Sequence, residues 1–174
     1  MKKIYILLMH TNTMPARLIK AVTQYEYSHV AISLEKNCYI TYSFGRKKLN
    51  SIIDGGFVVE QKDGAFFQKF NQTKCKIYEV NITEKQYKKV RKILKRMEHH
   101  QELYQYDFIG IVCRFFKIPV TFKNKYVCSY FVASLLEKAK IYDFEKETYF
   151  IAPKDFESIP FLNEIYHGKY LLYQ

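Results

Sequence analysis

The first eighty residues of the chain carry the hydrophobic pattern of β-strands. Residues 4–9 form a continuous apolar run, which is typical of a buried strand. Later segments combine β-branched and aromatic residues with alternating polar positions, so that each presents an apolar face. These segments are residues 28–34, 38–44, 57–60 and 74–80, with a tight hairpin predicted at Glu35-Lys36-Asn37.

The second half of the chain changes to helical periodicity. Thr83 followed by Gln86 is a capping-box sequence, in which side-chain and backbone groups at a helix start satisfy one another. Apolar residues at helical spacing then continue to about residue 98. Three more helices are expected, over residues 15–24, 106–116 and 128–139.

These elements predict a single α+β domain that spans residues 1–174. Strands come first and helices later, and residues 165–173 are expected to close the fold as a strand or a short helix. The chain is long enough to bury a core without metals or disulfides, because 48% of its residues are hydrophobic.

The net charge of +11 leaves two interpretations open. Lys and Arg gather at residues 46–48 and along the polar face of the helix expected over residues 83–98. Such a face is ordinarily solvated surface. It could also attract an anionic lipid, a nucleic acid or a cell-wall polymer. We expect no specific nucleic-acid partner, whereas an anionic surface and the oligomeric state stay open.

The four cysteines indicate free thiols rather than a metal centre or a disulfide framework. Cys38, Cys75, Cys113 and Cys128 show no CxxC spacing. The chain also lacks HExxH and EF-hand spacings and a glycine-rich phosphate loop, so neither a metal nor a cofactor is expected. The N-terminal apolar run is too short to span a membrane, and His10 follows it instead of a cleavage site. We therefore expect a cytoplasmic protein with reduced thiols.

Cys128 and His29 are the strongest candidates for chemistry. Cys128 opens the last predicted helix, where the helix dipole and unpaired backbone N–H groups are expected to lower the pKa of the thiol. His29 lies on a predicted strand, in Tyr-Ser-His-Val-Ala-Ile. An imidazole that meets this sulfur would complete a Cys–His nucleophilic pair. The alternative is that Cys128 is a small buried hydrophobe and His29 a structural histidine.

Strand alternation places His29 on a face of small and hydroxyl-bearing residues. Ala31 and Ser33 share that face, and the larger apolar residues of the strand point the other way. The face is expected to leave room for the start of the helix and for a substrate. The next strand turns hydroxyl groups to one side, and any of these could orient the imidazole: Tyr39, Thr41 and Ser43.

The order of these motifs is distinctive. The histidine strand comes first, a hairpin strand ending Tyr-Ser-Phe-Gly-Arg follows, and a late helix opens with Val-Cys-Ser-Tyr-Phe-Val-Ala. The chain then continues through Ile-Ala-Pro-Lys-Asp-Phe to Ile-Tyr-His-Gly-Lys. Over residues 4–173 this arrangement resembles the circularly permuted papain-like, NlpC-type superfamily, and within it the YiiX-like group of permuted amidases.

The resemblance implies an antiparallel, barrel-like sheet packed against helices, with the nucleophile at a helix N-terminus. Cys128 would be the nucleophile and His29 the general base of acyl transfer through a thioester. The family's third catalytic residue is His, Glu, Asn or Gln on the strand after the histidine. This chain has hydroxyl groups there instead, so Thr41 and Ser43 are the expected candidates, with Glu60 as a further one.

Two functions are compatible with these features. The first is a cysteine hydrolase or acyltransferase that acts on an amide or ester bond of a peptide, isopeptide or lipid-linked substrate. The second is a non-catalytic module that holds an anionic polymer or membrane surface with its basic helix and its 16 tyrosines. A reactive Cys128 would favour the first function. Salt-dependent retention that survives Cys128→Ala would favour the second.

Overall fold

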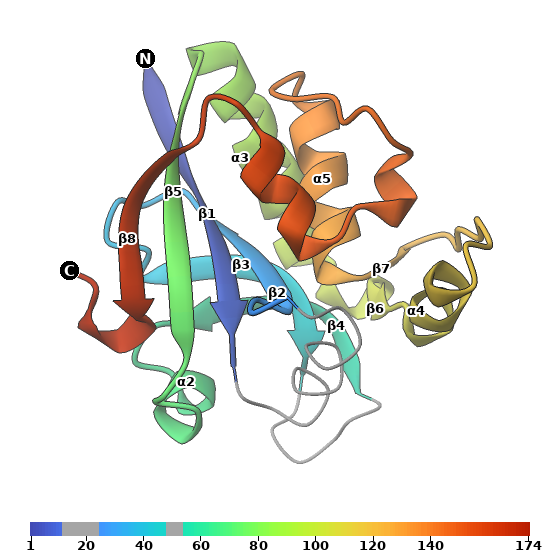
Figure 1. The fold of residues 1–174 in the computed structure, drawn as a ribbon, viewed down its shortest axis with the longest axis horizontal. Coiled ribbons are helices and arrows are strands. Elements are labelled where there is room, and N and C mark those ends of the chain that lie inside the picture. Colours follow the sequence, from blue (N-terminus) through green and yellow to red (C-terminus); the bar gives the residue numbers. More distant parts are fainter. Residues whose placement is uncertain (12–24, 48–53) are drawn as a thin grey trace.

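An eight-stranded sheet forms the centre of the computed structural model, which describes residues 1–11, 25–47 and 54–174. The strand order is β7-β6-β4-β3-β2-β1-β5-β8, and the neighbours run antiparallel except for the parallel pair β6 and β7. Figure 1 shows that the sheet curls into a half-barrel, with helices α3 and α5 packed on one side. The fold is therefore α+β, as the sequence predicts.

The elements have the following bounds. The strands are β1 (Lys2–His10), β2 (His29–Ser33), β3 (Ile40–Arg46), β4 (Gly55–Gln61), β5 (Lys74–Ile82), β6 (Gln105–Tyr106), β7 (Lys125–Tyr126) and β8 (Asn163–Lys169). The α-helices are α2 (Ala65–Lys69), α3 (Glu84–His99), α4 (Phe108–Phe115) and α5 (Cys128–Lys138). Four short 3-10 helices are η1 (Gln101–Leu103), η2 (Thr148–Phe150), η3 (Pro153–Ser158) and η4 (Tyr170–Leu172).

Most of the predicted elements are confirmed. The five predicted strands are β1 to β5, and the three later helices are α3, α4 and α5. The closing segment is a strand, β8, which pairs with β5. Helix α2 and the two-residue strands β6 and β7 were not predicted, because segments this short carry no periodicity. The helix predicted over residues 15–24 lies outside the described residues.

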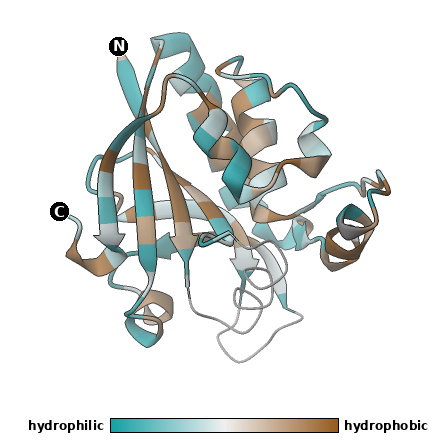
Figure 2. Ribbon diagram, viewed as in Figure 1, coloured by the Kyte–Doolittle hydropathy of each residue, from teal (hydrophilic) through white to brown (hydrophobic). Residues whose placement is uncertain are grey.

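The sheet has a hydrophobic core on each face, and β1 contributes to both. Ile4, Ile6 and Leu8 pack in the core under α3 and α5, whereas the residues between them pack in a second core under α2 and the C-terminal residues. A strand covered on both faces needs apolar residues at every position, which explains the uninterrupted apolar run. Figure 2 shows the resulting brown band through the middle of the sheet.

Helix α3 forms as its sequence predicts. The Thr83 side chain accepts a hydrogen bond from the Gln86 N–H, and the Gln86 side chain accepts one from the Thr83 N–H. Val90, Leu94 and Met97 are buried in the helix-side core. The lysines and arginines of the helix lie on its exposed face. The capping box and the amphipathic pattern together fix both the start and the orientation of this helix.

Two expectations about the strands need correction. Helix α5 packs on the Val30 and Ile32 face of β2, and not on the His29 face, because its apolar stripe requires an apolar partner surface. Cys38 was expected to share a face with Phe44, but β3 begins only at Ile40. The backbone of Cys38 has a φ of 50°, which turns the thiol into the second core.

In the described part of the chain, no helix combines the length and the apolar character that crossing a bilayer would require.

Candidate active site

Cys128 is the first residue of α5 and lies at the point where this helix meets the sheet. Its side chain is 5% exposed, and α5 packs against β2 and β3. The preceding residue, Val127, has no side-chain acceptor for the free N–H groups of the first turn. These groups therefore remain available to an anion, in contrast to the side-chain-capped start of α3.

The surroundings of the Cys128 sulfur act on its pKa in opposite directions. Burial is the largest influence and raises the pKa above that of an ordinary thiol. Hydrogen bonding from the backbone N–H groups of Val30 and Ser129, and the charge of Arg114, lower it. Together these influences raise the pKa of the Cys128 thiol, so the expectation of a lowered pKa is wrong for the resting protein. The helix start stabilises the thiolate, but the loss of hydration outweighs this effect.

His29 is the first residue of β2, and its side chain lies beside the neighbouring strand β3. A methyl group built on Gly45 of β3 would lie 3.9 Å from His29 Cε1, so the imidazole lies beside the Gly45 backbone. Burial lowers the pKa of His29 to about 4. The imidazole is therefore neutral at physiological pH, and a neutral imidazole can accept a proton.

The Val30 peptide N–H connects the two candidate residues. This group belongs to the peptide bond that follows His29, and it points at the Cys128 sulfur. Within the described residues, no hydrogen bond joins the thiol to the imidazole directly. The two residues thus share only the start of β2: neither acts on the pKa of the other, and α5 packs on the Val30 face of the strand, which the His29 side chain does not share. Catalytic hydrogen bonds are often long in ligand-free enzymes and tighten when substrate binds.

Ser43 and Thr41 have different positions relative to this pair. The Ser43 hydroxyl donates to the Val30 carbonyl oxygen at 2.6 Å, so it fixes the backbone at the residue after His29. The Thr41 hydroxyl donates to the Glu60 carbonyl oxygen at 3.3 Å. Thr41 is four residues from Gly45, about 13 Å along a strand. The structure therefore brings Ser43 to the site and leaves Thr41 away from it.

Glu60 lies on β4 opposite Thr41 and does not reach His29. Burial raises the pKa of its carboxyl group to about 7. Its charge raises the pKa of Tyr170, which lies in the second core, whereas burial is the only influence on the pKa of His29. Glu60 is thus a half-buried carboxyl group that does not act on the imidazole.

Three residues that the sequence analysis did not select lie around Cys128. The charge of Arg114 lowers the pKa of the thiol, and Cys128 in turn raises the pKa of Tyr106. Arg114 Nη1 is 3.6 Å from Asp107 Oδ2, and Nη1 and Nη2 are buried and form no hydrogen bond to the described protein. The spacing Asp107, Gly110, Arg114 places small and polar residues on one face of an apolar helix, and this pattern was the available signal.

Three of the other histidines, His99, His100 and His167, make their contacts elsewhere in the molecule. His167 Nε2 is 2.8 Å from the Tyr27 hydroxyl oxygen on β8's side of the sheet. His99 Nδ1 is 2.7 Å from the Lys95 carbonyl oxygen at the end of α3, and His100 lies 3.8 Å from Glu102. Each of these three contacts is typical of a structural or surface histidine.

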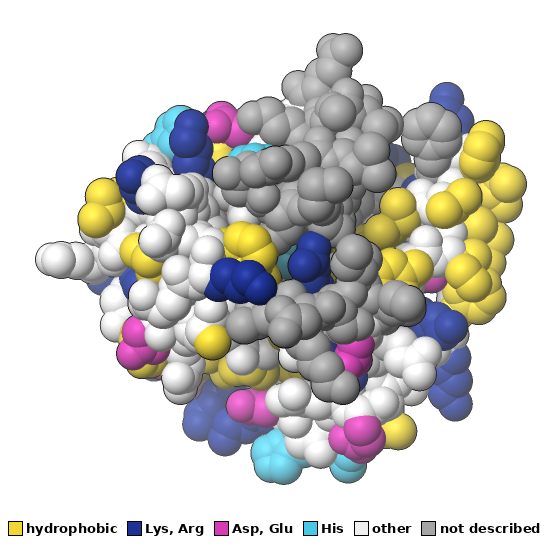
Figure 3. Space-filling model, turned by 90° about the horizontal axis from the view of Figure 1, so that it is seen from below, with side chains coloured by type: hydrophobic (Ala, Val, Ile, Leu, Met, Phe, Trp, Pro, Cys, Tyr) yellow, Lys and Arg dark blue, Asp and Glu magenta, His cyan; other side chains and the backbone are white. Residues whose placement is uncertain are grey.

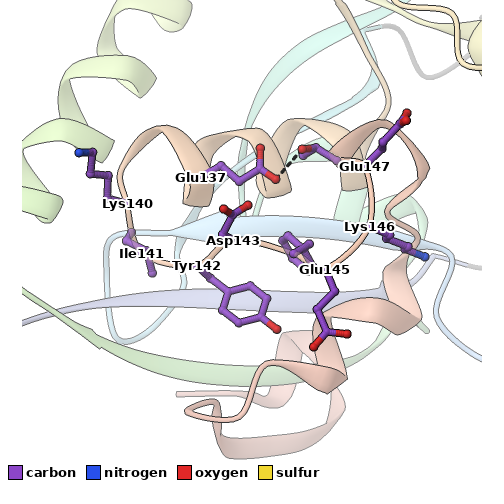
Figure 4. A pocket seen from close by; sticks show the side chains of 10 residues that line it. Glu137, Lys140, Ile141, Tyr142, Asp143, Glu145, Lys146 and Glu147 are labelled. Atoms are coloured by element: carbon purple, nitrogen blue, oxygen red, sulfur yellow. Dashed lines mark hydrogen bonds between the residues drawn. The ribbon is translucent and has the colours of Figure 1, made fainter.

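A broad pocket elsewhere in the molecule carries several carboxylates. It is lined by residues 137–148, which follow from the end of α5 into η2. The Thr148 hydroxyl donates a hydrogen bond to the Glu137 carboxylate. Figure 4 shows Glu145, Lys146 and Glu147 pointing in different directions around the rim. Within the described chain, no group of three or more His, Cys, Asp or Glu side chains converges as a metal site would require.

No protein-family model matches this chain, and no curated protein matches it.

Proposed function

We propose that this protein is a thiol hydrolase or acyltransferase of the permuted papain-like type, which cleaves an amide or ester bond with Cys128 and His29. One observation carries the proposal. The sulfur lies at the uncapped start of α5 and receives the backbone N–H of Val30, the residue that follows His29, whose imidazole is neutral and half-buried. The order of histidine strand and cysteine helix, and the half-barrel sheet, support the same fold family.

The raised pKa of Cys128 indicates general-base activation rather than a preformed ion pair. The thiol proton passes to the neutral imidazole of His29 as the sulfur attacks the carbonyl carbon of the substrate. The imidazolium then returns this proton to the leaving amine or alcohol, and an acyl thioester remains on Cys128. Water or another acceptor, deprotonated by the imidazole, releases the acyl group and restores the thiol.

Negative charge that develops on the substrate oxygen has donors available near Cys128. The first turn of α5 has no side-chain cap from Val127, its N–H groups at Cys128 and Ser129 point at the sulfur, and Arg114 carries two guanidinium nitrogens that form no hydrogen bond to the described protein. Preorganised donors of this kind contribute most where water is excluded. Ser43 has a positioning role, because its bond to the Val30 carbonyl holds the backbone of the residue whose N–H points at the sulfur.

Acylation by a small ester tests the proposal. The native protein is incubated with p-nitrophenyl acetate, the release of nitrophenol is followed, and the acyl adduct is located by peptide mass spectrometry. We expect the adduct on Cys128, its loss in Cys128→Ala, and an acylation rate about 10²- to 10⁴-fold lower in His29→Asn. The rate should persist down to about pH 5, because the imidazole remains neutral well below its usual range.

Cys113 provides the matched control for this experiment. It is a half-buried free thiol on α4, more accessible than Cys128. Cys113→Ser should acylate at the wild-type rate. An adduct on Cys113 instead of Cys128, or an equal rate in His29→Asn, would contradict the proposed Cys–His mechanism.

A further inference from the structure

Helix α4 and the segment after it expose apolar side chains on one continuous surface, which we call the α4 face. The most exposed members are Ile109 (58%), Val112 (57%), Phe116 (66%) and Ile118 (49%). Phe108 and Phe122 are exposed to a smaller extent. Figure 3 shows this surface as the large yellow area on the side of the molecule where α4 projects from the sheet in Figure 1. Apolar surface of this kind on a folded domain marks an interaction site.

Helix α4 turns its polar side toward the protein and its apolar side toward solvent, whereas an ordinary surface helix does the reverse. Asp107 Oδ1 accepts a hydrogen bond from the Gly110 N–H at 2.8 Å, and the Tyr149 hydroxyl donates to the Gly110 carbonyl oxygen at 3.2 Å. Arg114 Nε donates to the Tyr149 carbonyl oxygen at 2.6 Å. These bonds fix the orientation of α4, and its apolar stripe consequently faces outward.

The segment that carries the α4 face has only basic charged residues, although Asp54 and Glu102 lie beside Phe108 and Ile109 in a neighbouring pocket. Residues 108–136 contain no Asp or Glu, and Lys117 and Lys123 are exposed beside the apolar side chains. Neither of these lysines forms an ion pair with any described residue. Dark blue side chains border the apolar area in Figure 3. An apolar strip with a lysine border is the pattern of a helix that lies in the headgroup region of an anionic membrane.

We propose that the α4 face docks onto the surface of an anionic phospholipid bilayer, with Ile109, Val112 and Phe116 in the acyl boundary and the lysines at the headgroups. The border favours lipid over a protein partner, because lysine is depleted in protein–protein interfaces. The helix has eight residues and is about 12 Å long, which suits a position in the interface plane and not a span.

Docking would bring the candidate active site close to the lipid surface. Arg114 of α4 acts on the Cys128 thiol, so the docked helix and the nucleophile share a residue. A pocket of about 420 Å³ lies beside the start of α4 and is lined in part by Tyr106, Phe108 and Ile109. The docking proposal does not depend on acyl chemistry, because membrane binding by Cys128→Ala should equal that of the wild-type chain.

Vesicle sedimentation tests the docking. The full chain is mixed with sucrose-loaded vesicles of phosphatidylcholine alone or of phosphatidylcholine with 30% phosphatidylglycerol, and bound protein is measured. We expect binding to the anionic vesicles at least about 10-fold stronger than to the neutral ones. Ile109→Ser/Val112→Ser should weaken it about 10-fold or more, through lost apolar burial. Lys117→Glu/Lys123→Glu should weaken it by a similar factor on anionic vesicles only.

Matched controls separate the α4 face from general hydrophobicity and charge. Phe161→Ser/Leu172→Ser removes two exposed apolar side chains outside the α4 face, and Lys88→Glu/Lys92→Glu makes the same charge change on exposed positions of α3. Both should bind within about twofold of the wild-type chain, with unchanged circular dichroism for every variant. An equal loss in the α3 variant would overturn the assignment to the α4 face.

Two further results would overturn the proposal. The first is an absence of binding to either kind of vesicle. The second is a wild-type dimer in analytical ultracentrifugation that Ile109→Ser/Val112→Ser converts to a monomer, because the α4 face would then be covered by a second copy of the chain. A monomeric wild-type protein that binds anionic vesicles supports the docking. Equal binding by Cys128→Ala makes this result independent of the enzyme proposal.

Discussion

Helices α5 and α4 are both rich in apolar residues, but they use them in opposite ways. In α5, Phe131, Val132 and Leu135 are buried in the helix-side core. In α4, Ile109 and Val112 are exposed, and the residues that anchor the helix are polar. Hydrophobicity alone therefore does not tell where a helix lies. The difference arises because α5 meets an apolar sheet face, whereas α4 is fixed by its own capping carboxylate, by its own guanidinium and by Tyr149.

The comparison extends to the cysteine of each helix. Cys128 is nearly inaccessible and receives backbone N–H groups, and burial raises its pKa. Cys113 is half-buried on the docking helix. The helix that is fixed in the core thus carries the candidate nucleophile, and the helix that faces outward carries the candidate docking surface. A rigid attachment of the nucleophile is what acyl transfer requires.

The largest expected effect compares one apolar deletion in each helix. Leu135→Ala should lower the free energy of unfolding by about 2–5 kcal/mol, because it leaves a cavity in the helix-side core. Ile109→Ala should change it by less than about 0.5 kcal/mol, because that side chain is already exposed to water. Urea denaturation of both variants measures the difference. Equal destabilisation would show that α4 is buried in solution, for example against another copy.

The polar anchoring of α4 can be broken at Gly110. A methyl group there would lie 1.8 Å from Asp107 Oδ2 and 2.7 Å from Arg114 Nη1, so Gly110→Ala must displace the capping carboxylate. We expect a loss of about 1–3 kcal/mol in unfolding free energy, and faster amide exchange in α4 than in α5.

Gly45→Ala is the matched control for this substitution. Its nearest contacts would be 3.6 Å and 3.9 Å, which are ordinary van der Waals distances. Stability should therefore change by less than about 1 kcal/mol. A larger loss at Gly45 than at Gly110 would contradict the polar anchoring of α4.

The carboxyl groups of Asp107 and Glu60 differ in their surroundings. Arg114 lies beside Asp107, whereas burial is the only influence on the pKa of Glu60. Burial raises the pKa of Glu60 to about 7, so between about pH 4.5 and 7 the folded chain holds a proton that the unfolded chain has lost. The contribution of Glu60 to stability is thus fully present below this window and falls as pH rises through it. Glu60→Gln should be more stable than the wild type by about 1–3 kcal/mol at pH 8.5.

This advantage of Glu60→Gln should disappear at pH 4, where the carboxyl group is protonated in both states. Urea denaturation of both proteins at the two pH values measures it. Glu98→Gln is the matched control, because Glu98 is exposed and lines one pocket together with Glu60. This variant should be as stable as the wild type at both pH values. If the Glu60 variant gains nothing at pH 8.5, the carboxyl group is hydrated in solution.

The smallest effect concerns thiol accessibility in the native state. A bulky disulfide reagent such as Ellman's reagent should modify Cys113 at least about 10-fold faster than Cys128, because Cys128 is buried and mostly protonated. Cys38 and Cys75, which are fully buried in the second core, should react only on unfolding. Mass spectrometry after timed quenching assigns each site. Faster modification of Cys128 would mean that the start of α5 opens in solution.

Local signals in the sequence were sufficient for most of the elements. The capping box predicted the start of α3, and the apolar run of β1 predicted a buried strand. The stripe from Cys128 to Ala139 predicted the buried face of α5. His29 and Cys128 could be selected as candidates because a helix start and a strand are local features, and Cys128 is indeed the first residue of α5 and His29 the first of β2.

The rest of the site could not be predicted from neighbouring residues. Arg114 and Tyr106 reach Cys128 only because β6 pairs with β4, a contact between segments about fifty residues apart. The choice between Thr41 and Ser43 depended on the register of β2 and β3, which pairs Ile32 with Tyr42. A strand pattern gives the face of a side chain but not its partner across the sheet.

The sequence by itself determined which segments are strands and helices, where α3 and α5 begin, and which of their faces are apolar. Propensity, capping and periodicity act over a few residues, so a local pattern contains them. Only the tertiary structure decided that α4 turns its apolar side outward and that the pKa of Cys128 rises. Both outcomes depend on which distant groups remove water from a residue, and no local pattern contains this information.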